Sequence, residues 1–536
     1  MKRGILFFTL FVLFLFAPCL KAGHTLEMIA KIMGPDYHDN MGTRVAGLGD
    51  LNHDGFDDVG VTVPGKGKTY VYYGGNPMDD QPDLFLRGPS CVASAGDVNG
   101  DGWKDVITSD HLNCYIFYGA ETELDTVPDV ILPAEYPGDY FGSRLISAGD
   151  MNKDNYDDLL ILAPNYLDGR SDGKAYLYYG GDPMDTIPDW QLAGDLAEKR
   201  IQSVCALDFN GDGWIDIVIG KVGHYYVGTD SVPGEVDIFF GGPSEFDTIP
   251  DLVINPPDTL SYLWMSEFGG WWVSNLGNVN QDGYQDLGIL LGLTCGHPFV
   301  YLGGNPPDTL PALTLGEGSS RSRNFTYAGD VNKDGFPDVV NGDMCWGMGW
   351  GAVEVYLGSS NFNGVKDKWI TAADLPPDFI EDFGRSVSSA GDVNGDGVDD
   401  IIASSDNYWV ETNHRGEVFI FAGDSSITVS VYTDESGEMS YPENFSLSQN
   451  YPNPCNSTTV VGYSVKVSRL THVTLKIYNL LGEKVKTLVD KWQTKGDYQI
   501  KWNGKDNHGK EVASGIYFYR MKSENSEQTK RMLLIR

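Results

Sequence analysis

Seven copies of one acidic pattern divide most of this 536-residue chain into repeats. The pattern is Asp-x-Asn-x-Asp-Gly-x-x-Asp or a close variant, and its copies begin at Asp50, Asp97, Asp150, Asp208, Asn278, Asp330 and Asp392. A short apolar run follows each copy. Self-similarity at a period of roughly 50 residues is the signature of a repeat architecture. The repeat therefore constrains the fold more than any other feature of the sequence.

Each copy carries side-chain oxygens at loop positions 1, 3, 5 and 9, and the backbone carbonyl at position 7 can join them. Calcium prefers about six to eight oxygen ligands in flexible geometry, so the sequence predicts up to seven bound Ca²⁺ ions. The predicted ligands, loop by loop, are Asp50, Asn52, Asp54, Phe56 and Asp58; Asp97, Asn99, Asp101, Trp103 and Asp105; Asp150, Asn152, Asp154, Tyr156 and Asp158; Asp208, Asn210, Asp212, Trp214 and Asp216; Asn278, Asn280, Asp282, Tyr284 and Asp286; Asp330, Asn332, Asp334, Phe336 and Asp338; Asp392, Asn394, Asp396, Val398 and Asp400.

The fifth loop departs from the others. It begins with Asn278, so it holds two carboxylates where the other loops hold three. Less ligand charge predicts weaker cation binding, and we expect this site to be the last to fill.

The loops have two alternative interpretations. An EF-hand loop begins in the same way but ends in a bidentate Glu at position 12, and here that position holds Val61, Thr108, Ile161, Ile219, Ile289, Asn341 and Ala403. The apolar runs after the loops are short and β-branched, which indicates strands and not helices. A single Asp-Asn-Gly cluster can also be an ordinary turn, but seven copies in one register favour metal sites. Because the ligands lie inside each repeat, we expect the metal to be structural.

Several short strands surround each loop. A second strand ends in aromatic residues and glycine, as in Tyr72-Tyr73-Gly74, and an outer strand follows a turn such as Asp185-Thr186-Ile187-Pro188. Turn-rich units without helical periodicity are typical of propeller blades. Residues 25–34 read as an outer strand without a loop of its own, whereas the seventh repeat ends at Gly423 without one. We therefore expect the first strand to complete the last blade.

These residues resemble the FG-GAP repeats of integrin alpha subunits and bacterial extracellular proteins. Phe-Gly, Ala-Gly-Asp, the acidic loop and a Gly-x-Val-x-Ile-aromatic strand recur in order, although repeats two, four and six lack a clear Phe-Gly. The resemblance covers residues 24–424. It implies an all-β, seven-bladed β-propeller with calcium loops on one face.

The first 22 residues read as a secretory signal peptide. Lys2 and Arg3 precede an apolar stretch, and Leu20-Lys21-Ala22 is a passable cleavage site. A membrane anchor is the alternative, although the stretch is short for a spanning helix. A lipid anchor would use Cys19, but the residues before it fit that motif poorly. The mature chain is expected to have no transmembrane segment.

The C-terminal part changes character. Residues 425–444 read as a polar linker, and residues 445–536 show alternating strands that predict a small β-sandwich. This region resembles the C-terminal sorting domain of the type IX (Por) secretion system through Gln449-Asn450-Tyr451-Pro452-Asn453-Pro454 and Ser514-Gly515-Ile516-Tyr517-Phe518-Tyr519. Cys455 replaces the usual Phe. The resemblance implies a secreted or outer-membrane-surface protein of a two-membrane bacterium that is exported by the type IX machinery.

Composition limits the partners. The net charge is −37, which argues against nucleic acid and anionic membranes because phosphate binding needs clustered basic residues. Seven cysteines without a CxxC motif do not make a disulfide framework. Cys91 and Cys114 could pair or could be buried free thiols.

Three functions are compatible with these features: a secreted adhesion or binding module for a protein or glycan, a propeller enzyme acting on polysaccharide, and a structural surface component. The nine histidines are scattered, and no catalytic motif is present. We therefore expect a monomeric binding protein without catalytic activity. Candidate ligand contacts are Trp264, Trp271, Trp272, Trp346 and Trp350, because aromatic faces suit sugars and protein partners; the alternative is that they pack between blades.

Overall fold

A computed structural model describes the chain from residue 25 to residue 535. Within this range it does not describe residues 123, 166–171, 195–198, 224–233, 256–271, 292–296, 308, 310, 316–321, 344–350, 376–381, 407–414, 430–444, 456–457, 466–470, 480–483, 495, 508 and 524–525. The predicted signal peptide lies outside the described residues, as do Trp264, Trp271, Trp346 and Trp350.

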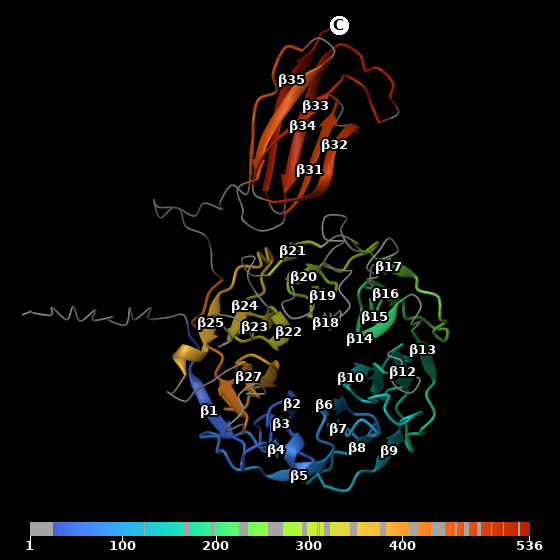
Figure 1. The fold of residues 1–536 in the computed structure, drawn as a ribbon, viewed down its shortest axis with the longest axis vertical. Helices are drawn as coiled ribbons and strands as arrows, with labels where there is room; N and C mark the ends of the chain where they lie inside the picture. Colours follow the sequence, from blue (N-terminus) through green and yellow to red (C-terminus); the bar gives the residue numbers. More distant parts are fainter. Residues whose placement is uncertain are drawn as a thin grey trace, which may run out of the picture.

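Seven four-stranded antiparallel sheets form a ring of blades (Figure 1). In chain order the strands of the first four blades are β2 (Val45–Gly49), β3 (Asp58–Val63), β4 (Lys68–Tyr72) and β5 (Leu84–Arg87); β6 (Cys91–Gly96), β7 (Asp105–Ser109), β8 (Asn113–Phe117) and β9 (Val130–Pro133); β10 (Arg144–Gly149), β11 (Asp158–Ala163), β12 (Lys174–Tyr178) and β13 (Trp190–Ala193); β14 (Arg200–Leu207), β15 (Asp216–Val222), β16 (Glu235–Phe239) and β17 (Leu252–Ile254).

The remaining blades follow the same order. Their strands are β18 (Trp272–Asn275), β19 (Leu287–Leu291), β20 (His297–Tyr301) and β21 (Leu313–Thr314); β22 (Ser322–Gly329), β23 (Asp338–Asp343), β24 (Ala352–Tyr356) and β25 (Lys368–Thr371); β26 (Val387–Gly391), β27 (Asp400–Ser405) and β28 (Glu417–Phe421). In the described residues, the short 3-10 helices η1 (Pro64–Lys66) and η3 (Ala372–Asp374) follow β3 and β25.

The first strand of the fold closes the ring. β1 (Met28–Met33) pairs antiparallel with β28, with Lys31 opposite Phe419, and becomes the outer strand of the seventh blade. This confirms the expected exchange between the two ends of the propeller. Closure removes an unpaired sheet edge.

The core lies between the blades. The described buried apolar residues of the propeller fall into one cluster for each pair of neighbouring blades, including the seventh and first. The second and third strands are buried on both faces, as in Asp58–Val63 and Lys174–Tyr178, which explains their continuous apolar sequences. The predicted all-β propeller is confirmed.

The C-terminal domain is a two-sheet β-sandwich, as predicted. One sheet has the order β29 (Phe445–Leu447), β30 (Thr459–Val465) and β33 (Gly496–Trp502), and the other has β32 (Lys484–Gln493), β31 (Thr471–Tyr478), β34 (Gly515–Ser523) and β35 (Ser526–Leu534). Trp502, Leu475 and Tyr519 lie in its core.

Candidate metal centres

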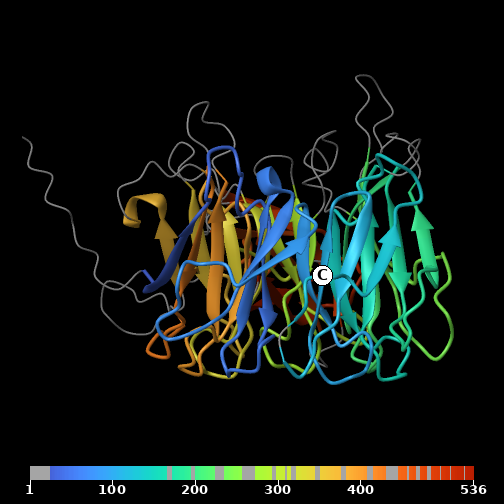
Figure 2. The same ribbon diagram turned by 90° about the horizontal axis from the view of Figure 1, so that it is seen from below.

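The seven acidic loops occupy equivalent places. Each joins the first strand of a blade to its second strand, so all seven lie at one end of the ring, which we call the loop face; it is the lower edge in Figure 2. We call the opposite end, where the first strands begin, the start face. Strands and not helices follow the loops, which excludes the EF-hand interpretation.

The first loop shows how the predicted ligands are held. Asp50 accepts hydrogen bonds from the amides of Asp54 and Gly55 at 3.2 and 3.0 Å, and Asn52 Oδ1 also accepts from the Asp54 amide at 3.1 Å. Asp54 Oδ1 accepts from the amide of Phe56 at 3.0 Å. The side chains at positions 1, 3 and 5 are thus positioned by the loop's own backbone. The same bonds recur in the second, third, fourth, sixth and seventh loops.

The aspartate at position 9 ties the loop to its sheet. Asp58 accepts from the amide of Leu51 at 2.7 Å and from the amide of Gly74, which follows the third strand, at 2.8 Å. All seven position-9 carboxylates are fully buried. Burial raises the pKa to about 7 for Asp58, Asp105, Asp158, Asp216, Asp286 and Asp400, and to about 8 for Asp338. The two amide bonds to each group lower its pKa by less than burial raises it.

The donor chemistry of the loops fits a hard divalent cation, but a closed ligand shell is not formed. Within the described residues, no three His, Cys, Asp or Glu side chains are gathered closely enough to hold a metal ion. In the seventh loop, Asn394 Nδ2 lies 3.3 Å from Asp400 Oδ1, so positions 3 and 9 meet. A carboxylate oxygen that accepts one hydrogen bond keeps a lone pair for a cation. Each loop therefore places its predicted ligand side chains on the same turn, but the described side chains do not converge on one metal position.

The fifth loop is less completely bonded. Asn278 Oδ1 accepts from the amide of Asp282 at 3.0 Å, but an amide nitrogen replaces the second carboxylate oxygen and cannot accept a bond from Gly283. Among the seven described loops it is the one without the bond from position 6 to position 1. Its departure from the sequence pattern thus also removes one of the bonds that position the loop.

The loops contact each other around the ring, through side chains that the ligand pattern does not use. In the first five loops the side chain at position 7 meets position 4 of the preceding loop, and in the sixth and seventh loops the glycine at position 6 takes that place. Aromatic rings cover glycines where Phe56 meets Gly395, Tyr156 meets Gly100 and Tyr284 meets Gly211. The ring centroids of Trp103 and His53 lie 4.0 Å apart, and Lys153 Nζ lies 3.8 Å from the centroid of the Trp214 ring. In the last two pairs of loops, Gln281 Nε2 donates to the Gly335 carbonyl and Lys333 lies beside Gly397.

Position 8 makes a second connection between loops. Asp57 accepts from the Asp392 amide at 2.8 Å and donates its own amide to the Asp392 carbonyl at 3.0 Å. Asp157, Gln285 and Asp399 make the equivalent side-chain bond to Asp97, Asp208 and Asp330. The extra carboxylates at position 8 could have signalled this role, because they fall outside the metal pattern.

Other residues that the sequence singled out are packed within or between the blades. Trp272 lies at the start of the fifth blade and packs against the cluster between blades five and six. Cys91 and Cys114 are buried free thiols, so the pairing alternative is wrong; they lie on β6 and β8 with β7 between them.

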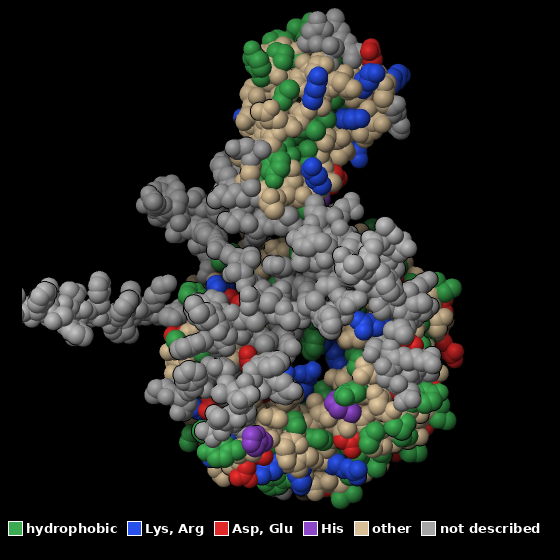
Figure 3. Space-filling view, in the orientation of Figure 1, with side chains coloured by type: hydrophobic (Ala, Val, Ile, Leu, Met, Phe, Trp, Pro, Cys, Tyr) green, Lys and Arg blue, Asp and Glu red, His purple; other side chains and the backbone are tan. Residues whose placement is uncertain are grey.

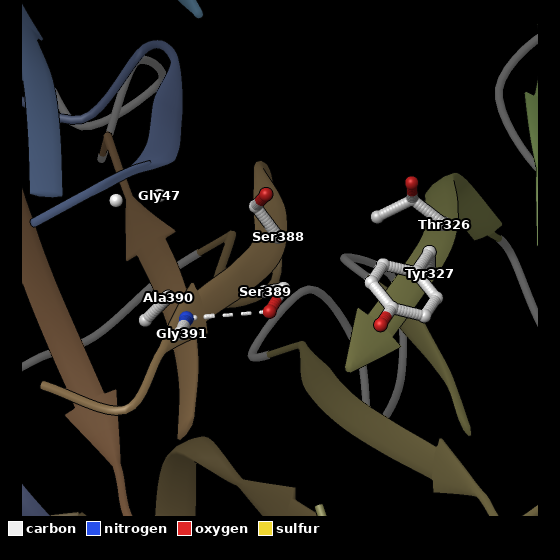
Figure 4. A pocket seen from close by; sticks show the side chains of 8 residues that line it. Gly47, Thr326, Tyr327, Ser388, Ser389, Ala390 and Gly391 are labelled. Atoms are coloured by element: carbon white, nitrogen blue, oxygen red, sulfur yellow. Dashed lines mark hydrogen bonds between the residues drawn. The ribbon is translucent and has the colours of Figure 1, made fainter. Parts of the chain in front are cut away.

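Gly47 of β2, Tyr327 of β22 and Ser389 of β26 line a pocket of about 280 Å³ in the central channel (Figure 4). No Asp, Glu, His, Lys or Cys lines this pocket.

The fold and the loops define a class: a closed seven-bladed propeller with one acidic loop in each blade. Residues 383–421, in the seventh blade, match the FG-GAP repeat, which confirms that this chain carries FG-GAP repeat sequence. Residues 458–527 match the FlgD Ig-like domain, a description different from the sorting domain suggested by the motifs.

The relatives include integrin alpha subunits. The chain is 33% identical to Integrin alpha-5 of Xenopus laevis over 165 residues, which are 28% of this chain and 15% of that protein, and 27% identical to Integrin alpha-6 of Homo sapiens over 226 residues, 41% and 18%. Phosphatidylinositol-glycan-specific phospholipase D of Bos taurus is 30% identical over 225 residues, 39% and 25%. The chain thus spans a quarter or less of the length of these relatives.

Among solved structures, one titled "Crystal structure of BBS1N in complex with ARL6DN, soaked with mercury" aligns with 76% of this chain and 99% of that chain at a TM-score of 0.46 and 8% identity. A likeness this weak adds nothing to the sheet topology. No helix in the described residues is long and apolar enough to cross a membrane.

Proposed function

We propose that this protein is a secreted or cell-surface binding module whose propeller is stabilised by calcium and presents a face to a protein or glycan partner. The observation that supports this most directly is the repetition of one loop bond network in six of the seven blades, with a reduced version in the fifth. Resemblance to integrin alpha subunits supports a binding or adhesion role.

Calcium is the proposed cation because all donors are oxygens and no loop contains sulfur or imidazole among its ligands. The predicted ligands of each loop would hold the ion, with the carbonyl at position 7 completing the set. When bound, the ion would neutralise carboxylates that otherwise repel one another. Because the ligands are built on the turn between two strands, cation binding and folding of the blade would be coupled.

We propose that the protein acts by binding and not by catalysis. The position-9 carboxylates are engaged with backbone amides, and the described channel pocket is lined by Gly, Ser, Ala, Thr and Tyr. A relative is named as a phospholipase, but the chain spans only 25% of that protein, and no motif of a hydrolase accompanies the propeller here.

We further propose that the C-terminal sandwich serves export of the type IX kind and that the mature protein lies outside the outer membrane. The two motifs behind this proposal form one unit. The Asn450 amide donates to the Tyr519 hydroxyl at 2.8 Å, and Tyr519 donates to the Ser448 carbonyl at 2.9 Å. The Cys455 amide donates to the Leu533 carbonyl at 2.8 Å, which fixes the proline-rich segment along the last strand.

The proposed binding function is tested by probing protein and glycan arrays with the calcium-loaded full-length protein, and in parallel with protein freed of divalent ions. Binding to a defined set of ligands that disappears without calcium is the expected result. An array that remains blank with folded, calcium-loaded protein would contradict the binding role and favour the structural alternative.

A further inference from the structure

Four arginines gather at the start face, where the central channel opens. Arg144 and Arg200 are the first residues of β10 and β14. Arg44 immediately precedes β2, and Arg385 lies two residues before β26. In Figure 3, which shows this face, Lys and Arg side chains appear at the centre of the ring. A concentration of positive charge is unexpected in a chain with a net charge of −37.

Arg144 spans the channel mouth. Its side chain extends from the third blade past the fourth and reaches the fifth. There its Nη2 donates to the Val273 carbonyl of β18 at 2.9 Å. The guanidinium carbon lies 3.5 Å from the centroid of the Trp272 ring. Its Nε and Nη1 are shielded from solvent and have no hydrogen-bond partner among the described residues. Two charged donors therefore remain at the mouth without an acceptor.

Arg44 adds a second positive charge. Its Nη1 donates to the Thr43 carbonyl at 3.1 Å. Burial raises the pKa of the Cys91 thiol, and both Arg44 and Arg144 lower it, which places the two guanidinium groups around this residue of the second blade. The pKa of Arg144 is lowered to about 10, chiefly by burial, and the charge of Arg44 contributes to the lowering.

In the described part of the chain, no acidic side chain neutralises the charge of Arg44 or Arg144. Arg385 has one, because its Nε lies 3.2 Å from Asp406, but no described carboxylate forms an ion pair with Arg44 or Arg144. The nearby thiols do not serve, since burial raises the pKa of Cys205 to about 12 and keeps it neutral. A buried charge without a partner is costly, and the repulsion between these two like charges adds to that cost.

We propose that Arg44 and Arg144 form an anion-binding site at the mouth of the channel, and that its ligand is the carboxylate of an acidic side chain presented by a partner polypeptide. Guanidinium groups bind carboxylates through short, charge-assisted hydrogen bonds. The partner assignment rests on the proposed binding function; the anion site does not.

The charge of the whole protein favours an isolated carboxylate over an anionic polymer. A polyuronate or nucleic acid would bring many negative charges against an acidic surface. A single Asp or Glu side chain on a neutral or basic partner meets only the local positive field. We therefore expect sugar acids to bind more weakly than an acidic peptide.

The experiment is isothermal titration of the full-length protein with three probes: the capped peptides Ac-Gly-Asp-Gly-NH₂ and Ac-Gly-Asn-Gly-NH₂, and sodium glucuronate at the same ionic strength. The Asp peptide should bind with a dissociation constant of about 1 mM, and the Asn peptide should give no heat. Arg44→Gln and Arg144→Gln should each weaken binding at least about tenfold. Arg87→Gln is the matched control, because it removes the same charge from the exposed outer strand of the first blade.

Equal binding of the two peptides, or unchanged binding by both variants, would overturn the site. Tighter binding of glucuronate than of the Asp peptide would overturn the polypeptide assignment. If Arg144→Gln does not fold, Arg44→Gln alone decides, because that side chain is less tied to its surroundings. Array binding that survives both substitutions would overturn the partner assignment and leave the proposed function standing. A positive titration with a blank array would leave the anion site standing and contradict the proposed function.

Discussion

The ring of Phe56 in the first loop covers Gly395 in the seventh, so closely that a Cβ on Gly395 would lie 2.5 Å from Phe56 Cε1. Together with the bond between Asp57 and the Asp392 amide, this contact joins the two ends of the propeller on the loop face. The pairing of β1 with β28 joins them through the outer strand of the seventh blade. Closure thus uses two separate devices, one in the loops and one in the sheet.

Gly395→Ala should destabilise the propeller by about 2–4 kcal/mol, because the methyl group meets an aromatic ring and the residue has φ of +73°. Urea denaturation of the metal-free protein measures this. Gly213→Ala is the control: it has φ of +82° and open space around the added Cβ, so it should show the backbone cost alone. In a Phe56→Ala background the cost of Gly395→Ala should fall; an unchanged cost would contradict the contact.

Calcium should raise the melting temperature strongly. Each occupied site adds about 3 kcal/mol at a hundredfold excess over its dissociation constant. Thermal melts of protein freed of divalent ions, with and without added calcium, measure the effect. Magnesium should stabilise less, because it demands a smaller octahedral shell. An identical midpoint with and without calcium would show that the loops are ordinary turns.

The sequence predicts features of the fold and of the loops whose signals lie close together along the chain, but not side-chain contacts between residues far apart in it. The loops and the borrowed strand were predictable because their signals are local: Asp50 and Asp58 lie in one turn, and residues 25–34 lack a preceding loop. The contact of Phe56 with Gly395 was not, because it depends on which blades become neighbours. The position of Arg144 was not either, since its side chain passes the fourth blade to reach Val273 of the fifth.

The fifth loop should bind calcium most weakly. Crystals grown over a range of calcium concentrations should show this loop filling last, because it has one carboxylate fewer and lacks the bond from the Gly283 amide. Asn278→Asp should bring its occupancy up to that of the others. Asp330→Asn in the sixth loop is the matched opposite change and should make that loop fill late. If the unaltered fifth loop fills first, ligand charge does not set the order.

The metal-free protein should lose stability as the pH rises from 5.5 to 8. The position-9 carboxylates have a pKa of about 7 to 8 when folded, above the ordinary value of 3.8. The folded state therefore holds more protons than the unfolded state between these values, and stability falls as pH rises through them. With calcium the trend should reverse, because ligand carboxylates bind the ion in their deprotonated form.

Melting temperatures at pH 5.5, 6.5 and 8, with and without calcium, test this. The stabilisation by calcium, taken as the difference between the two series, should widen as the pH rises. Protein freed of divalent ions on a chelating resin avoids the pH dependence of soluble chelators. A metal-free melting temperature that increases with pH would show that burial of these carboxylates does not dominate their titration.

Removal of the C-terminal sandwich should leave the propeller folded but prevent its export. The truncation belongs after Val429, because Ile427 is buried against the cluster between blades six and seven and Val429 packs beside it. In a host with the type IX machinery, the truncated protein should accumulate in the periplasm while the full-length chain reaches the surface or medium. Calcium-dependent melting of the trapped protein separates failed export from failed folding. Release of folded, truncated protein at the full-length level would contradict the sorting role and leave the sandwich as a domain of another kind, in keeping with its match to the FlgD Ig-like domain.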